Sequence, residues 1–366
     1  MSSKRRAVSR DESTDFYSDW LRHSKANERA VANSRVVARG RDLTWIETPN
    51  EHRIAMLIGR QVGFPTQGTS LCKVSVPADH HTGRHRHGEE AVHVLSGGGF
   101  VVVDGRRYEI RPGTTVHIPY MSDHQLFSIG EELTYVTASA MDLDLYAMLG
   151  RLEQLEEKGP NAPGVERSVP AEEGQFDADG RRIALHLEDA PNEQERREAA
   201  RRRAAQQGDG GTGDGREHGH GSHDGHGNNG GRGHSENPHR HGAIYILMGG
   251  GESPSDERNG FAAVSAAMTN IFEEVPHTSS HCHSHTEAVL YVLEGVGFSE
   301  IDDQHYDWEA GDAVHVPPEM TRHEHFNPSD MRTRTLRIEY GIRYFYEPQW
   351  KGYAKVEHRE EAIARP

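Results

Sequence analysis

Two closely spaced histidine pairs, 198 residues apart, are the residues of this chain best suited to chemistry. The first pair is His85 and His87, and the second is His283 and His285. In a β-strand, residues i and i+2 point to the same face, so both imidazoles of one pair can face the same interior. Imidazole nitrogen is a common ligand of Fe, Zn, Cu and Ni. The pairs therefore predict metal sites built on strands.

Much of the sequence that follows each pair repeats at the same offset of 198 residues. The repeated positions are Glu89 and Glu287, Gly97 and Gly295, Gly99 and Gly297, Phe100 and Phe298, Asp104 and Asp302, Tyr108 and Tyr306, Gly113 and Gly311, His117 and His315, and Pro119 and Pro317. A repeat of fixed offset indicates two copies of one structural unit. We therefore expect two β domains, each with a possible metal site and thus one or two metal ions per chain.

The first copy offers a carboxylate and a third histidine in addition to its histidine pair. Glu89 and Glu90 follow the pair directly, and His124 lies beyond a turn and a further strand. Two or three imidazoles with one carboxylate leave coordination positions open, which suits a reactive Fe(II) or Mn(II) centre better than a closed structural zinc site. The candidate ligands are His85, His87, Glu90 and His124, with Glu89 as the alternative carboxylate.

The second copy offers potential ligands at four alternate positions: His281, His283, His285 and Glu287. His323 lies further along the chain. The offset of the repeat selects His283 and His285 as the partners of the first pair, and it leaves His281 as an additional candidate.

Composition and charge narrow the class of protein. The chain has 366 residues, a formal net charge of −16 and 34% hydrophobic residues. The negative charge argues against a general nucleic-acid binder, and no apolar run is long enough to cross a membrane. Two cysteines cannot build a disulfide framework, and the basic N-terminus lacks the apolar stretch of a signal peptide. We expect a cytoplasmic protein without nucleic-acid or membrane partners.

Short β-branched runs bounded by Gly, Pro and Asp predict an all-β barrel or sandwich. The expected segments are a disordered N-terminus (1–14), a helical region packed on the first β domain (15–53), the first β domain (54–145), a charged helical connector (146–207), a flexible linker rich in Gly and His (208–242), the second β domain (243–345) and a C-terminal tail (346–366). The seven histidines of the linker could bind transition metals loosely, but a solvated linker is the simpler interpretation.

These motifs resemble those of bicupins, whose two domains are double-stranded β-helices, also called jelly rolls. The first cupin motif has two similar sets of residues in this chain: His85, His87, Glu90 and Gly97, and then His281, His283, Glu287 and Gly295. The second motif is similar to Gly113, Pro119 and His124, with Ser128 in place of the usual Asn, and to Gly311, Pro317, His323 and Asn327. The resemblance covers about residues 65–140 and 260–345. In the second copy it selects His281 and His283, which we follow, as ligands together with Glu287 and His323.

Within the bicupins, the N-terminal region and the His-Arg-His sequence resemble the gentisate 1,2-dioxygenase type, which includes salicylate and 1-hydroxy-2-naphthoate dioxygenases. This resemblance implies a homo-oligomeric oxidoreductase that uses Fe(II) and O2 to cleave the ring of a small hydroxylated aromatic acid. Arg84 or Arg86 is the candidate partner of the substrate carboxylate. Strand alternation argues against Arg86, so Arg84 is the preferred catalytic residue.

Glu90 departs from the gentisate type, which typically uses three histidines and no glutamate in its first cupin. The chief alternative is a Mn(II)-dependent decarboxylase or oxidase of the oxalate type, which keeps a His-His-Glu-His set in both halves. A further alternative is a non-catalytic bicupin that is stabilised by metal and binds a small molecule. A transcription regulator is the weakest hypothesis, because no helix-turn-helix pattern accompanies the two copies.

Overall fold

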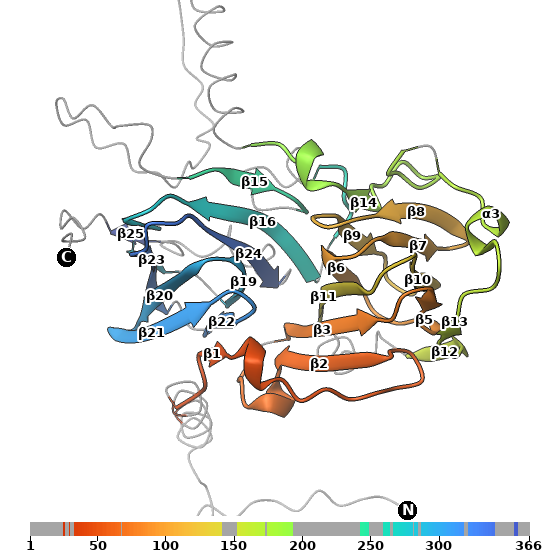
Figure 1. The fold of residues 1–366 in the computed structure, drawn as a ribbon. Coiled ribbons are helices and arrows are strands. Elements are labelled where there is room, and N and C mark those ends of the chain that lie inside the picture. The colour runs from red at the N-terminus through yellow and green to blue at the C-terminus, as the bar shows by residue number, and fades with distance from the viewer. Residues whose placement is uncertain are drawn as a thin grey trace, which may run out of the picture.

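The computed structural model describes most of both expected β domains. The described residues are 33–66, 68–140, 152–172, 174–192, 242–248, 259–263, 266–280, 282–284, 287–317, 321–340 and 355–357, together with Lys25 and Arg29. Two β domains lie side by side (Figure 1). Within these ranges, no helix is long and apolar enough to cross a membrane. The prediction of an all-β chain with two domains is confirmed.

The first domain consists of two sheets that enclose an apolar core. One sheet has the order β14-β9-β6-β11-β3-β2, with β2 at Arg53–Ile58, β3 at Ser70–Val76, β6 at Glu90–Ser96, β9 at Thr115–Ile118, β11 at Leu133–Ser139 and β14 at Ala184–Leu185. The other has the order β12-β5-β10-β4-β13, and β7 joins it by pairing with β10 and β8. Its strands are β4 at His80–His81, β5 at Arg84–Arg86, β7 at Gly99–Val103, β8 at Arg106–Ile110, β10 at His124–Ser128, β12 at Glu153–Glu156 and β13 at Gly159–Pro160.

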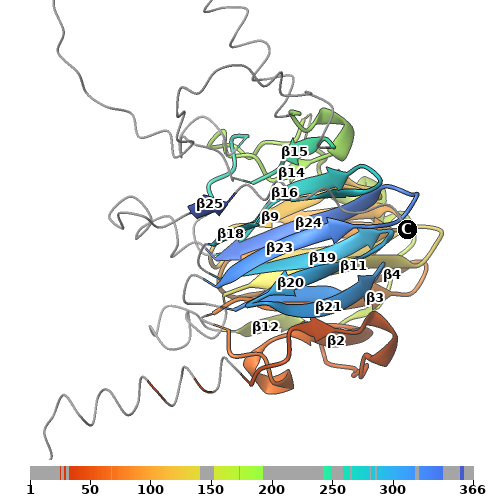
Figure 2. The same ribbon diagram turned by 90° about the vertical axis from the view of Figure 1, so that its left-hand side faces the viewer.

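The second domain repeats this plan, and Figure 2 views the molecule from its side. One sheet has the order β1-β22-β19-β24-β16-β15, with β1 at Val37–Ala38, β15 at Ile244–Ile246, β16 at Ala266–Glu274, β19 at Ala288–Glu294, β22 at Ala313–Val316 and β24 at Thr333–Tyr340. The other has the order β21-β20-β23-β18-β25, with β17 paired to β23. Its strands are β17 at Thr278–Ser279, β18 at Cys282–Ser284, β20 at Val296–Ile301, β21 at Gln304–Glu309, β23 at Arg322–Asn327 and β25 at Lys355–Glu357.

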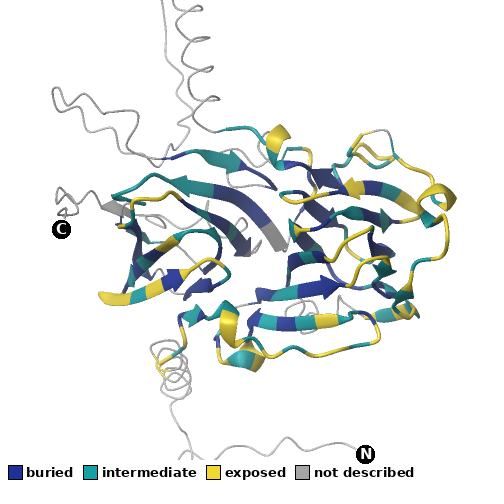
Figure 3. Ribbon diagram, viewed as in Figure 1, coloured by how far each residue is buried: buried dark blue, intermediate teal, exposed yellow. Residues whose placement is uncertain are grey.

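Alternation along the strands separates two apolar cores. Val92 and Val94 of β6 face the interior of the first barrel and pack with Val116 and its neighbours. Ala91 precedes Val92 in β6 and faces the opposite side of the sheet. It belongs to a second core that contains residues of both domains, among them Phe64, Val136, Phe261, Met268 and Val289. Both faces of these central strands are therefore buried, as Figure 3 shows by colour.

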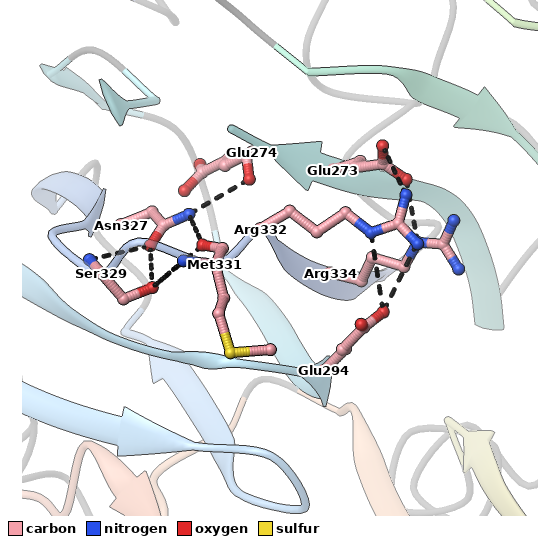
Figure 4. Close-up of polar contacts among 8 residues, drawn as sticks. All are labelled: Glu273, Glu274, Glu294, Asn327, Ser329, Met331, Arg332 and Arg334. Carbon is pink, nitrogen blue, oxygen red and sulfur yellow. Dashed lines mark hydrogen bonds and ion pairs between the residues drawn. The ribbon is translucent and has the colours of Figure 1, made fainter. Parts of the chain in front are cut away.

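Polar side chains hold the turn that follows β23 (Figure 4). Asn327 donates through Nδ2 to the carbonyl oxygens of Glu274 (3.1 Å) and Met331 (2.8 Å). Ser329 donates through its amide and its hydroxyl to Asn327 Oδ1, at 3.2 and 2.8 Å. In the first domain Ser128 occupies the corresponding place and donates to the carbonyl oxygens of Pro77 and His80. The difference between Ser128 and Asn327 therefore changes the side chain that holds a turn and not a residue of the histidine cluster.

The N-terminal segment differs from the expected helical region. Lys25 and Arg29 are helical, but residues 33–53 form β1, a 3-10 turn at Gly40–Asp42 and the start of β2. β1 pairs with β22 of the second domain rather than packing on the first, with Val37 opposite Val314. The β-branched residues before Ala38 favour an extended chain, and the edge of the second domain supplies the partner strand.

The connector also differs from the helices expected in it. Its described residues form β12, β13, the one-turn helix α3 at Val165–Ser168, β14 and a 3-10 turn at Leu187–Asp189. These strands extend both sheets of the first domain at their edges. Residues 141–151 and 193–207 of the expected helices, and the linker up to His241, lie outside the described residues.

Candidate metal centre

Three histidine side chains of the first domain converge inside the barrel. The pairing of β5 with β10 places His85 opposite His124, and His87 follows β5 directly. The ring centroids of His85 and His124 are 4.2 Å apart, and those of His87 and His124 are 4.9 Å apart. All three side chains are buried, and their potential ligand atoms lie within 4.8 Å of one another. Among the described residues, no other three His, Cys, Asp or Glu side chains come this close.

Backbone carbonyl groups fix the tautomer of all three rings. Each Nδ1 lies at hydrogen-bond distance from a carbonyl oxygen: Gly83 for His85 (3.0 Å), Gly88 for His87 (2.8 Å) and Ser122 for His124 (3.0 Å). A carbonyl oxygen only accepts, so Nδ1 carries the proton and donates it. In the neutral ring, Nε2 then keeps its lone pair, which is the form that binds a metal ion.

Glu90 supplies the carboxylate of the cluster. Its Oε2 lies 3.4 Å from His87 Nε2 and 3.3 Å from His124 Nε2, and Thr137 donates a hydrogen bond to Oε1. Burial alone would raise the pKa of Glu90, but the hydrogen bonds and charges of His124 and His87 bring it well below its usual value. The carboxylate is therefore ionised.

Glu89 faces the opposite side of the strand and is not part of the cluster. Its Oε1 accepts a hydrogen bond from His117 Nε2 at 2.8 Å, and the His117 ring packs edge-on against Phe261 of the second domain. Of the two carboxylates that the sequence left open, the structure thus places Glu90 at the histidines.

The cluster fits a divalent metal ion. Burial, His124 and His87 lower the pKa of His85 to about 3, so this ring is neutral near pH 7. Glu90 Oε2, 3.3 Å from His124 Nε2, can pair with this nitrogen only when the ring is protonated. In the neutral ring the buried Nε2 has no hydrogen-bond partner, which is costly unless something binds it. Three imidazole nitrogens and one carboxylate are a donor set for Fe(II) or Mn(II). His85, His87, His124 and Glu90 would hold the ion.

Arg84 lies on the outer face of β5, away from the histidines. Its guanidinium pairs with Glu156 at 2.7 Å and with Asp123 at 3.5 Å. Arg86 lies on the same face and pairs with Glu153 at 2.8 Å, because residues i and i+2 of a strand share a face. The role of Arg84 in substrate binding stays a prediction, and its outward position lends that role no support.

Glu51, in the loop before β2, is an acidic residue near the cluster that no sequence motif indicates. Burial raises its pKa; the hydrogen bond from Thr48 acts against this, and the charge of Glu90 adds to it. The charges of His87 and His124 also act on its carboxyl group. A carboxyl group close to the cluster with a raised pKa is suited to carry a proton.

The second domain contains one pair of histidines in the same arrangement. β18 pairs with β23 so that His283 lies opposite His323, as His85 lies opposite His124. The centroids of the His283 and His323 rings are also 4.2 Å apart. His283 therefore corresponds to His85, as the 198-residue offset predicts, and the choice between His281 and His285 as its partner stays a prediction. His281 and His285 lie outside the described residues.

Glu287, predicted as a metal ligand, has a different role in the structure. Its Oε1 accepts a hydrogen bond from His315 Nε2 at 2.7 Å, as Glu89 accepts one from His117. The position of Glu90 is taken by Ala288, which pairs with Val316 as Glu90 pairs with Ile118. Glu287 therefore takes the place of Glu89, on the other face of the strand from Glu90, and this geometry does not support its role as a ligand, which stays a prediction.

Comparison with known proteins agrees with this architecture. The sequence profile of the cupin domain matches residues 73–139 and 271–339. Solved structures of oxalate decarboxylase from Bacillus subtilis are similar to this chain. A variant of that enzyme and a structure concerned with its substrate binding mode are both 12% identical, with TM-scores of 0.56, over 84% of this chain and 77% of theirs. One concerned with its Mn(II) centres is 11% identical, with a TM-score of 0.55. At these identities the similarity shows the fold alone.

A short sequence match leads to a protein without a described activity. An uncharacterised protein of Methanocaldococcus jannaschii is 33% identical over 63 residues, which are 17% of this chain and 50% of that protein. The match therefore spans half the length of this relative.

Two similar barrels, one of them with a buried cluster of three histidines and a glutamate, define a two-domain β protein with a candidate metal centre. With the cupin profile matching once in each barrel, the chain is a bicupin of the cupin superfamily.

Proposed function

We propose that the first cupin is a divalent-metal centre that cleaves the carbon–carbon bond of a small dicarboxylate of the oxalate type. The observation that carries the proposal is the carboxylate of Glu90, 3.3 Å from His124 Nε2 and 3.4 Å from His87 Nε2. The gentisate type implies three histidines without a glutamate, whereas the oxalate type implies this set. The shared fold with a Mn(II)-containing oxalate decarboxylase supports the same choice.

The residues of the site have separable tasks in this reaction. A divalent ion bound there would act as a Lewis acid on the substrate carboxylate. His85, His87 and His124 present imidazole nitrogens, and Glu90 supplies one negative charge. Decarboxylation of the oxalate monoanion breaks the carbon–carbon bond, releases CO2 and leaves an electron pair on the second carbon. That carbon takes up one proton while its own carboxyl group gives one up, so formate forms with no net consumption of protons and no external oxidant or reductant. Glu51 is the proposed proton donor.

Substitution of Glu51 tests this assignment. We expect Glu51→Gln to lower kcat for oxalate by about 100-fold or more, the range of general acid catalysis, with a smaller effect on KM. Glu47→Gln is the matched control, because Glu47 lies in the same loop and pairs with Lys158 while its own side chain is largely exposed. Formate release by the Mn(II)-loaded variants is the measurement. Wild-type turnover in Glu51→Gln would remove Glu51 from the mechanism.

A ring-cleaving dioxygenase is the second candidate function. The close approach of His85, His87 and His124 and the resemblance of the His-Arg-His sequence to the gentisate type support it. The test is O2 uptake by Fe(II)-loaded protein with gentisate, salicylate and 1-hydroxy-2-naphthoate, matched to loss of the aromatic compound. Absence of turnover in both assays would favour a metal-stabilised binding protein. A homo-oligomeric state and a cytoplasmic location stay predictions.

A further inference from the structure

The interior of the second barrel differs from that of the first at the positions next to the metal cluster. In the first barrel Thr137 lies opposite Cys72 and donates to Glu90. The corresponding position in the second barrel holds Arg337, which lies opposite Asn270. Ala288 has replaced the carboxylate. The second barrel therefore lacks the carboxylate of Glu90 and has instead an arginine, which pairs with Glu339 opposite Ala288.

The Arg337 guanidinium lies inside the barrel beside the histidines. Its side chain is 16% exposed, and Nη2 contacts Glu339 Oε1 at 2.6 Å. Its positive charge contributes to lowering the pKa values of His323 and His325, after burial and the neighbouring His283. The ion pair with Glu339 uses a single nitrogen, although a guanidinium has a fork of donors suited to a carboxylate.

His325 has the opposite tautomer from the histidines of the metal cluster. Trp308 Nε1, which only donates, gives a hydrogen bond to Ser299 Oγ at 3.0 Å. Ser299 is fully buried, and His325 Nδ1, at 2.7 Å, is the acceptor within reach of its hydroxyl proton among the described residues. His325 Nδ1 therefore accepts, and Nε2 carries the proton.

A protonated Nε2 donates to anions and does not ligate metal ions. The ring centroid lies 5.3 Å from that of His323. In the described part of the second domain, no three potential ligand atoms gather as they do in the first.

The buried side chain of Asn270 is independent evidence for a ligand at this place. It lies directly opposite Arg337 on the neighbouring strand, where paired side chains are about 5 Å apart at Cβ. Its side chain is 4% exposed, and Oδ1 is buried without a hydrogen-bond partner. Such an acceptor suits the hydroxyl group of a ligand.

We propose that the second cupin binds a small hydroxycarboxylate anion through Arg337, His325 and Asn270. The carboxylate would take the free side of the Arg337 fork and the Nε2 proton of His325, and the hydroxyl would donate to Asn270. This inference concerns a different barrel from the proposed catalytic centre.

Calorimetric titration of the Mn(II)-loaded full-length protein with malate tests the ligand. We expect Arg337→Gln to weaken one malate site by at least about 10-fold, the effect of losing a charged hydrogen-bond pair. Arg334→Gln is the matched control, because Arg334 lies on the same strand but pairs outside the barrel with Glu273 at 2.9 Å (Figure 4).

A double variant keeps the test valid if the single variant unfolds. Arg337→Gln leaves Glu339 buried without its cation, whereas Arg337→Gln with Glu339→Gln removes both charges. We expect the double variant to fold and to lack the same malate site. Malate binding equal to that of Arg334→Gln, or no malate site of this kind in the wild type, would show that Arg337 and Glu339 form only a structural ion pair. Malate binding is measured without turnover, so failure of oxalate cleavage does not affect it.

Discussion

Hydrogen bonds to Nδ1 decide what each histidine of this protein can bind. In the first barrel three carbonyl oxygens take the Nδ1 protons and leave Nε2 as a donor atom for a metal ion. In the second barrel the Ser299 hydroxyl donates a hydrogen bond to His325 Nδ1, so the proton of this ring is on Nε2. The same residue type is thus prepared for a cation in one barrel and for an anion in the other.

The neighbouring glutamates of the first barrel allow a matched test of the metal set. We expect Glu90→Gln to weaken Mn(II) binding by more than about 10-fold. Loss of a residue that only hydrogen-bonds to a metal ligand already weakens metal binding by about that factor, and loss of a ligand should cost more. Glu89→Gln should keep wild-type affinity, because Glu89 is bonded to His117 on the other face. Titration followed by Mn(II) electron paramagnetic resonance measures both. Equal affinities would show that Glu90 is not a ligand.

His93 makes folding stability depend on pH. Burial lowers its pKa to about 4, and the unfolded value is about 6.5. Between these values the unfolded chain binds more protons, so stability is present above pH 6.5 and is lost as the pH falls toward 4. From pH 7 to 5 we expect His93 to account for a loss of about 2 kcal/mol. Urea unfolding of wild type and His93→Gln at both pH values measures it. An unchanged pH dependence in the variant would contradict this.

Sequence spacing identified the residues of the first cluster but not their surroundings. His85, His87, Glu90 and His124 were predictable because strand periodicity and the repeat constrain them. Glu51 was not, since its approach to the cluster depends on how a distant loop packs. The structure gives Glu287 the place of Glu89, which the sequence did not indicate, because a single-residue difference in spacing changes the face to which a side chain points.

At the scale of elements, strand pairing positions the site. The opposition of His85 and His124 follows from the register of β5 and β10, and the opposition of His283 and His323 follows from β18 and β23. The strands of both barrels were predictable from β-branched runs between turn residues. Short edge strands such as β1 and β12 were not, because their few residues become strands only beside a tertiary partner.

The attachment of β1 to the second domain depends on Asp312. Its carboxylate accepts from Arg39 Nη1 at 2.7 Å and from the Gly40 amide at 2.8 Å. We expect Asp312→Ala to lower the free energy of unfolding by about 2 kcal/mol, because a buried set of charged hydrogen bonds is lost. Glu309→Gln, in the exposed pair with Arg41, should cost less than about 0.5 kcal/mol. Chemical denaturation compares them, and equal effects would contradict this role of Asp312.

At the scale of the whole molecule, the two cupins share a core. Phe64 of the first domain packs edge-on against His315 of the second, with centroids 5.8 Å apart. Phe261 of the second packs in the same way against His117 of the first, at 6.2 Å. These mirrored contacts bury the Glu89–His117 and Glu287–His315 pairs beside an apolar interface.

The shared core predicts that the two domains unfold together. We expect one cooperative transition in the wild type, and Phe64→Ala and Phe261→Ala should each lower stability by about 3–5 kcal/mol, as for other buried aromatic residues. Scanning calorimetry with the metal-loaded protein measures this. Two separate transitions in the wild type, with each variant shifting only one, would contradict a shared core.

The central claim is that the first cupin alone carries a metal-dependent activity on a small dicarboxylate. The most direct measurement is release of CO2 and formate from oxalate by Mn(II)-loaded wild type, His124→Ala and His323→Ala. We predict equal amounts of the two products from wild type, none from His124→Ala and retained activity in His323→Ala. No products from oxalate, together with O2 uptake and loss of an aromatic acid after Fe(II) loading, would contradict the account and establish the dioxygenase instead.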